Sequence, residues 1–72
     1  MSEALSEQDA GAQKQRDVEA AGAAPGQWRY AGQRFANGAA AAEYINREPA
    51  QHAGEVSATV LSDGTVELFV YF

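Results

Sequence analysis

The sequence has no cysteine, a single lysine and a single histidine, and its apolar runs are short. Without cysteine, neither disulfides nor thiolate metal sites can stabilise the fold. No run approaches the roughly 20 apolar residues that cross a bilayer. The first ten residues carry Glu3, Glu7 and Asp9 where a secretory signal has a basic and then an apolar stretch. These absences predict a cytoplasmic protein without membrane contact.

Basic residues are also scarce. Lysine and arginine together number 5, against 10 aspartates and glutamates, and the net charge is −5 at pH 7. Non-specific affinity for nucleic acids comes mainly from neutralisation of phosphates by lysine and arginine. The composition therefore argues against nucleic acid as the main partner.

No grouping of residues in the sequence is typical of catalysis. There is no cysteine nucleophile, no serine with a fixed base, and no glycine-rich phosphate loop. His52 and Glu55 are spaced for a shared ligand, but two such residues without a third make a poor metal site, so His52 is predicted to be a solvated loop residue. We expect no enzymatic activity, no catalytic or metal-binding residues and no cofactor.

The chain divides by composition near residue 26. Residues 1 to 26 are rich in alanine, glutamine and glycine and contain only three larger apolar side chains. These are too few to offset the entropy of ordering, which predicts a flexible acidic tail that forms at most a transient helix between about Glu7 and Ala21. All seven aromatic residues follow. Residues 27 to 72 are therefore predicted to be the folded module.

The first half of this module predicts a strand and then a helix. Residues 27 to 35 have the alternation of a strand, which Gly32 weakens or bulges. Asn37 is suited to cap a helix that starts just after it and ends before Pro49. Its buried face is expected to contain Ala41, Tyr44 and Ile45.

The last 18 residues predict a β-hairpin. A two-residue loop at Asp63 and Gly64 would mix polar and apolar side chains on both faces. A three-residue loop at residues 62 to 64 pairs Val60 with Val66 and places every valine on one face. The predicted fold is thus α+β, a small β-α-β-β module with an antiparallel sheet and one helix on one face, preceded by the disordered tail.

This register leaves aromatic rings on the second face of the sheet, which a single helix does not cover. Exposed apolar patches on small proteins usually mark interfaces, and the last strand is expected to leave a hydrophobic edge. The sequence thus predicts a non-catalytic protein-binding module, an adaptor, subunit or inhibitor that binds another protein, itself, or both, as a homodimer. The expected partner-binding residues are Trp28, Tyr30, Leu61, Phe69, Tyr71 and Phe72.

Three other interpretations remain open at this stage. The sheet can curl so that Phe69 and Tyr71 lie in the core. The chain can be an acidic inhibitor that blocks the nucleic-acid site of a larger enzyme. It can also bind single-stranded nucleic acid by aromatic stacking, with Arg29 and Arg34 supplying charge. The acids that would form the inhibitory ridge are Glu43, Glu48, Glu55, Asp63 and Glu67.

Overall fold

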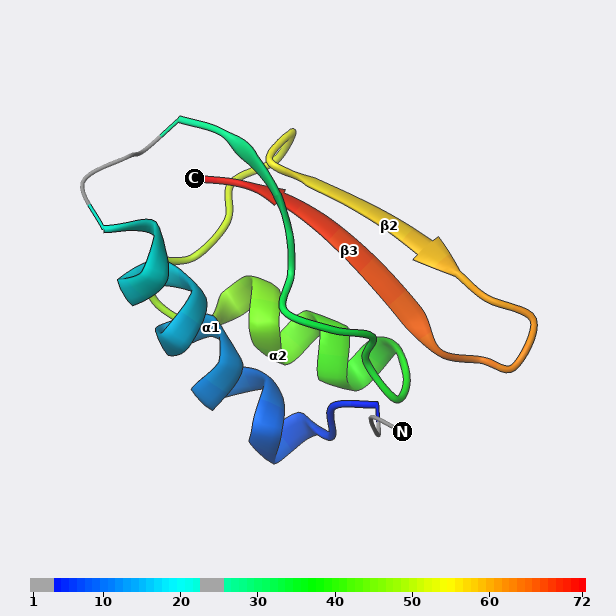
Figure 1. The fold of residues 1–72 in the computed structure, drawn as a ribbon. Helices are drawn as coiled ribbons and strands as arrows, with labels where there is room; N and C mark the ends of the chain where they lie inside the picture. Colours follow the sequence, from blue (N-terminus) through cyan, green and yellow to red (C-terminus); the bar gives the residue numbers. More distant parts are fainter. Residues whose placement is uncertain (1–3, 23–25) are drawn as a thin grey trace.

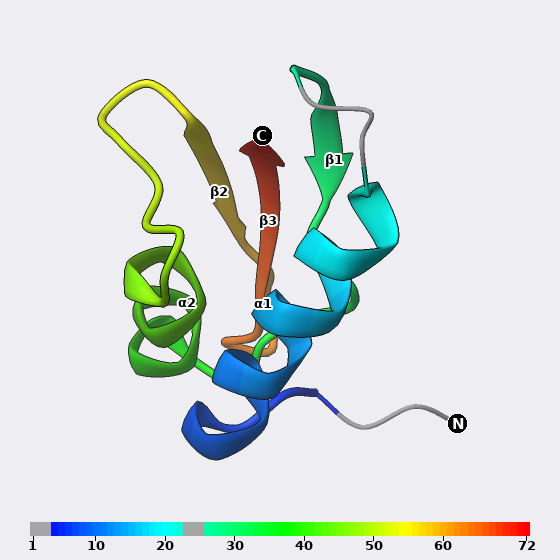
Figure 2. The ribbon, with the colours of Figure 1, turned by 90° about the vertical axis from the view of Figure 1, so that its left-hand side faces the viewer.

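Two helices and three strands lie in the part of the chain that the structure describes. It is a computed structural model and describes residues 4–22 and 26–72. The elements are α1 (Glu7–Ala21), β1 (Trp28–Tyr30), α2 (Gly38–Asn46), β2 (Val56–Val60) and β3 (Val66–Tyr71). The strands form one layer and both helices lie on the same side of it (Figures 1 and 2). The α+β class with an antiparallel sheet is confirmed.

The strand β3 is the middle strand of the sheet, whose order is β1-β3-β2. Both neighbours are antiparallel to it. The amide of Ala31 donates to the Leu68 carbonyl at 3.0 Å on one side, and the amide of Tyr71 donates to the Glu55 carbonyl at 2.8 Å on the other. The expectation that the last strand leaves a free hydrophobic edge is therefore wrong, because β1 pairs with the side of β3 that β2 does not occupy. The free edges of this sheet belong to β1 and β2.

The predicted hairpin register is confirmed. Val60 pairs with Val66, and the pairing continues in step to the other end of β2. The amide of Leu61 donates to the Thr65 carbonyl at 2.8 Å, which closes a three-residue loop. Gly64 has a φ of 87°, a left-handed conformation that glycine adopts without steric cost.

The helix α2 begins as predicted. The Asn37 side chain accepts a hydrogen bond from the Ala40 amide at 3.0 Å and so caps the first turn. The side chains of Ala40, Ala41 and Tyr44 are buried. The helix ends at Asn46, before Pro49.

The helix α1 differs from the expected flexible tail, and the β-α-β-β order is not confirmed because α1 precedes β1. Ser6 caps α1 by accepting a hydrogen bond from the Asp9 amide at 3.3 Å. The helix packs on α2 through Ala10, Gly11 and Lys14. Two of these residues are small, so the helices approach closely without large apolar side chains. Residues 1–3 and 23–25 of the expected tail lie outside the described residues.

The core lies between the helical layer and β3. Val66, Leu68 and Val70 of β3 are buried, as are Phe35 and Tyr44, whose rings meet edge to face at 5.2 Å. The predicted strand over residues 27 to 35 is interrupted after Tyr30. The chain turns at Gly32 and pairs again at Phe35, which forms bridges to both Leu5 and Val66.

Neither helix in the described part of the chain is long and apolar enough to span a membrane.

Candidate functional site: an aromatic sheet face

Four aromatic side chains from β1 and β3 lie on the face of the sheet opposite the helices. We call Trp28, Tyr30, Phe69 and Tyr71 the aromatic face. The strands pair Trp28 with Tyr71 and Tyr30 with Phe69. Side chains alternate along a strand, so these four point away from the buried Leu68 and Val70. Trp28 and Tyr30 of β1 therefore lie on the same face of the sheet as Phe69 and Tyr71 of the hairpin.

The rings of the aromatic face form two contacting pairs. The centroids of Trp28 and Tyr71 are 5.7 Å apart at 67°, and those of Tyr30 and Phe69 are 5.5 Å apart at 60°. These are the tilted arrangements that aromatic rings prefer, so each ring restricts the motion of its neighbour. Both pairs are thus in contact within the single chain.

Each ring of the aromatic face remains accessible to solvent. The exposed fractions are 54% for Trp28, 42% for Tyr30, 46% for Phe69 and 37% for Tyr71. This exposure excludes the alternative in which Phe69 and Tyr71 form the core of the single chain. The described helices cover the other face.

Polar side chains border the rings on the side of β2 and toward the hairpin loop. The Tyr30 hydroxyl donates to Glu67 Oε2 at 3.1 Å, and burial together with this hydrogen bond raises the pKa of Tyr30. Ser57 and Thr59 of β2 are exposed on the same side of the sheet by alternation. At the hairpin loop, Arg34 contacts Asp63 at 3.7 Å. An apolar centre with a polar rim is the usual composition of a protein interface.

Two residues expected in the interface lie apart from the four rings. Leu61 is half-buried next to the hairpin loop. Phe72 is half-buried and packs against the core. The Arg29 guanidinium lies 5.0 Å from the centroid of the Phe72 ring, and Arg29 Nε donates to the Phe72 carbonyl at 3.1 Å. The contacts of Phe72 thus connect it to the core rather than to the aromatic face.

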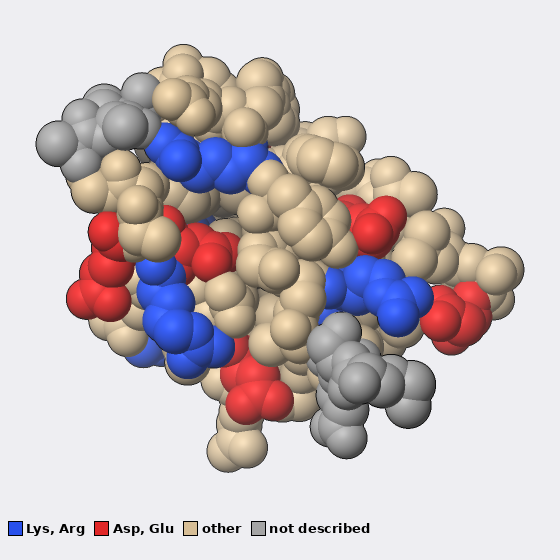
Figure 3. All heavy atoms as spheres, viewed as in Figure 1, with Lys and Arg blue, Asp and Glu red and all other residues tan. Residues whose placement is uncertain are grey.

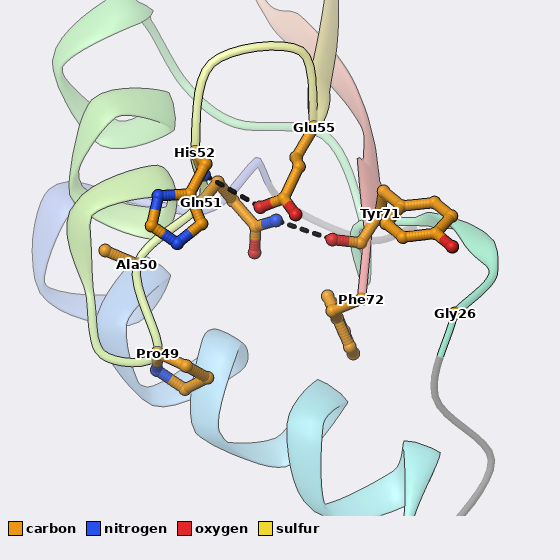
Figure 4. Close-up of a pocket in the computed structure, with 8 residues that line it drawn as sticks. All are labelled: Gly26, Pro49, Ala50, Gln51, His52, Glu55, Tyr71 and Phe72. Atoms are coloured by element: carbon orange, nitrogen blue, oxygen red, sulfur yellow. Dashed lines mark hydrogen bonds between the residues drawn. The ribbon is translucent and has the colours of Figure 1, made fainter.

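A hollow of about 380 Å³ lies beside Tyr71, at the end of the sheet. In Figure 4 the loop before β2 forms one wall of this hollow, and Tyr71 and Phe72 form the other. Gln51 Nε2 donates to the Tyr71 carbonyl at 2.8 Å, and the His52 amide donates to Glu55 Oε1 at 2.8 Å. The His52 side chain is exposed, as predicted. The hollow adjoins the aromatic face because both contain Tyr71.

The acids proposed for the inhibitory ridge lie on five different parts of the chain: α2, the loop after it, the loop before β2, the hairpin loop and β3. Figure 3 shows acidic and basic side chains mixed over one face of the molecule, without a large area of either sign. Within residues 4–22 and 26–72, no three histidine, aspartate or glutamate side chains are placed to hold a metal ion together.

A buried polar network on the helical side was not predicted from the sequence. The Lys14 side chain is buried, donates to the Tyr44 carbonyl at 3.1 Å and lies 4.9 Å from the Tyr44 ring centroid. The Tyr44 hydroxyl donates to Asp17 at 2.5 Å. Burial lowers the pKa of Lys14, although Asp17 and two other nearby carboxylates oppose this effect, whereas burial and the bond to Asp17 raise the pKa of Tyr44. The network holds α1 on α2.

Comparisons of this chain with protein-family models, with curated proteins and with solved structures find no match.

Proposed function

We propose that this chain is a non-catalytic protein-binding module, an adaptor, subunit or inhibitor, that forms a homodimer and binds another protein through the aromatic face. The observation that carries the proposal is the exposure of four aromatic rings on the side of the sheet away from the described helices. Tryptophan and tyrosine are enriched among the residues that dominate binding energies at protein interfaces.

The arrangement of the rings supports this use. Trp28 and Tyr71 contact each other, as do Tyr30 and Phe69, so little side-chain entropy remains to be lost on binding. The hydrogen bond from Tyr30 to Glu67 fixes one polar group at the border. A partner that presents an apolar surface with a basic residue opposite Glu67 would fit both features.

The test uses the full chain as bait in a cell extract, with Trp28→Ser and Tyr71→Ser as the altered baits. Ala42→Ser is the matched control, because Ala42 is exposed on α2, away from the aromatic face. We expect a partner that the wild type and the control retain and that both aromatic variants lose. For the purified partner, truncation of a central ring should cost about 2 kcal/mol, roughly thirtyfold in Kd.

The salt dependence separates this proposal from the two alternatives. Binding through apolar rings should change little between low and moderate salt, whereas an acidic inhibitor should lose affinity steeply. A single-stranded oligonucleotide probe, oligo(dT), should show no binding at 150 mM salt. The proposal fails if both aromatic variants, still folded by circular dichroism, retain every partner of the wild type.

A further inference from the structure

The outer edge of β2 carries unpaired backbone groups. The Glu55 carbonyl accepts a hydrogen bond from the Tyr71 amide, and the Leu61 amide donates one to the Thr65 carbonyl, so residues 55, 57, 59 and 61 direct their backbone groups toward the other hairpin strand. In an antiparallel pair such residues alternate with residues whose groups point the other way. The amides and carbonyls of Val56, Ala58 and Val60 therefore point away from β3. An edge of this kind can pair with a further strand.

The β2 edge lacks the features that normally prevent such pairing. Its sequence, VSATV, contains no charged residue, proline or glycine. The opposite edge strand, β1, has only three residues, includes Arg29, and is followed closely by Gly32 with a φ of 44°. Short length, charge and irregular backbone are the usual protections of an edge. The two edges differ, and β2 is the one suited to pairing.

Exposure along β2 supports the same conclusion. Residues 57 to 60 are all exposed, and Val60 is 72% exposed although it belongs to the valine face. The loop end of the hairpin extends beyond both helices in Figure 1, and the exposed fraction of Val60 shows that neither helix covers this side chain.

We propose that the occupant of this edge is a second copy of the chain, paired antiparallel through β2 about a two-fold axis at Ala58. Only this register pairs all five residues of β2 with their copies. It sets Val56 opposite the second copy's Val60, Ser57 opposite Thr59, and Ala58 opposite itself. The small Ala58 side chains at the axis permit close approach, and cross-strand valine pairs stabilise a sheet.

Charge also favours β2 as the strand in contact. Each copy has a net charge of −5, so the copies repel each other, and a contact strand with no charged residue places no acid directly opposite another. Screening by salt should therefore strengthen the dimer. A contact of five residues a side lies at the low end of interface sizes, so the dimer should depend on concentration.

The inference rests on the homodimer of the proposed function and names its interface. A two-fold axis perpendicular to the sheet joins the two sheets into one of six strands with both aromatic faces on the same side. Self-association then leaves the aromatic face free for another protein.

Cysteine cross-linking tests the register, because the chain has no cysteine of its own. In the proposed dimer the Cα atoms of Ala58 and its copy are about 5.5 Å apart, within disulfide range, so Ala58→Cys should form a cross-linked dimer on mild oxidation. The control is Ser57→Cys, whose two copies lie about 8 Å apart from the strand spacing and rise, too far for a disulfide. Equal cross-linking of both variants, or none of Ala58→Cys, overturns the register.

Sedimentation measurements over a series of protein and salt concentrations test whether the dimer forms through the β2 edge. Val60→Lys should raise the dimer dissociation constant at least about tenfold, equal to 1.4 kcal/mol, even though the added charge lowers the repulsion between copies. Ala42→Lys makes the same change of charge on α2, away from β2, and should not weaken the dimer, because it lowers the same repulsion without blocking the edge. A monomer at every concentration refutes both the homodimer and this edge. A dimer that survives Val60→Lys but is lost in Tyr71→Ser refutes β2 as the dimer interface but not the homodimer itself.

Discussion

Gly11 offers a direct test of whether α1 belongs to the fold. It lies inside α1, in the second turn, on the face packed against α2. A Cβ added there would meet the Arg47 side chain at 3.6 to 3.8 Å, which is ordinary van der Waals contact. Gly11→Ala should therefore add a side chain without steric cost.

The expected gain can be worked from two terms. Alanine is about 1 kcal/mol more favourable than glycine in a helix interior, and burial of one methyl group contributes about 0.8 kcal/mol. The free energy of unfolding should rise by about 1 to 2 kcal/mol. For a domain of this size, each kcal/mol raises Tm by roughly 4 to 8 °C.

The assay is thermal and urea denaturation, with Ala12→Gly as the control. Ala12 is exposed in the same helix, so Ala12→Gly should lower the stability by about 1 kcal/mol through helix propensity alone. If the segment were a flexible tail, neither substitution would change Tm. A loss of stability in Gly11→Ala would mean instead that Arg47 cannot accommodate the methyl group.

Two further predictions concern the core and the buried network. Leu68→Ala removes a fully buried side chain and should lower the free energy of unfolding by about 2 to 5 kcal/mol. In urea denaturation of the dilute, monomeric chain, Val60→Ala, on the same face but exposed, should change it by less than about 0.5 kcal/mol. In alkaline titrations of stability, the lowered pKa of Lys14 means that the unfolded chain binds the proton more tightly, so stability should rise as pH approaches 10.5. The raised pKa of Tyr44 has the opposite effect above pH 10.0, where the unfolded chain loses this proton first, so stability should then fall. Lys14→Met should abolish the rise. Tyr44→Phe should reduce the fall and leave the contribution of Tyr30, whose pKa is also raised. Persistence of both changes at full size in these variants would show that other groups cause them.

The sequence predicted those parts of the fold that depend on local patterns. The hairpin register follows from alternation and from Gly64, and the start of α2 follows from Asn37. Such signals lie within a few residues of the structure that they determine.

The sequence predicted α1 only as a transient helix over these residues and did not predict that it packs, because its buried face has no apolar stripe. Ala10 and Gly11 allow close packing by being small, and Lys14 is buried only because Tyr44 supplies an acceptor and a ring. The central place of β3 was missed for a related reason, since the pairing of β1 with β3 joins residues about forty positions apart. Long-range contacts of this kind leave no local pattern.

The aromatic face was predicted in part. Alternation within the hairpin correctly separated Phe69 and Tyr71 from the valines, while the joining of Trp28 and Tyr30 to them depended on the pairing with β1. Phe72 follows the alternation of Val70, and the structure accordingly packs it against the core.

The burial of Lys14 determines how the folded protein responds to reagents. Lys14 is the single lysine of the sequence, and its side chain is fully enclosed between the helices. Acylating reagents, lysine-directed cross-linkers and tryptic cleavage at this residue all require the amine or its backbone to become accessible. Modification of Lys14 therefore measures how often α1 separates from α2, which makes this side chain a built-in reporter of local opening.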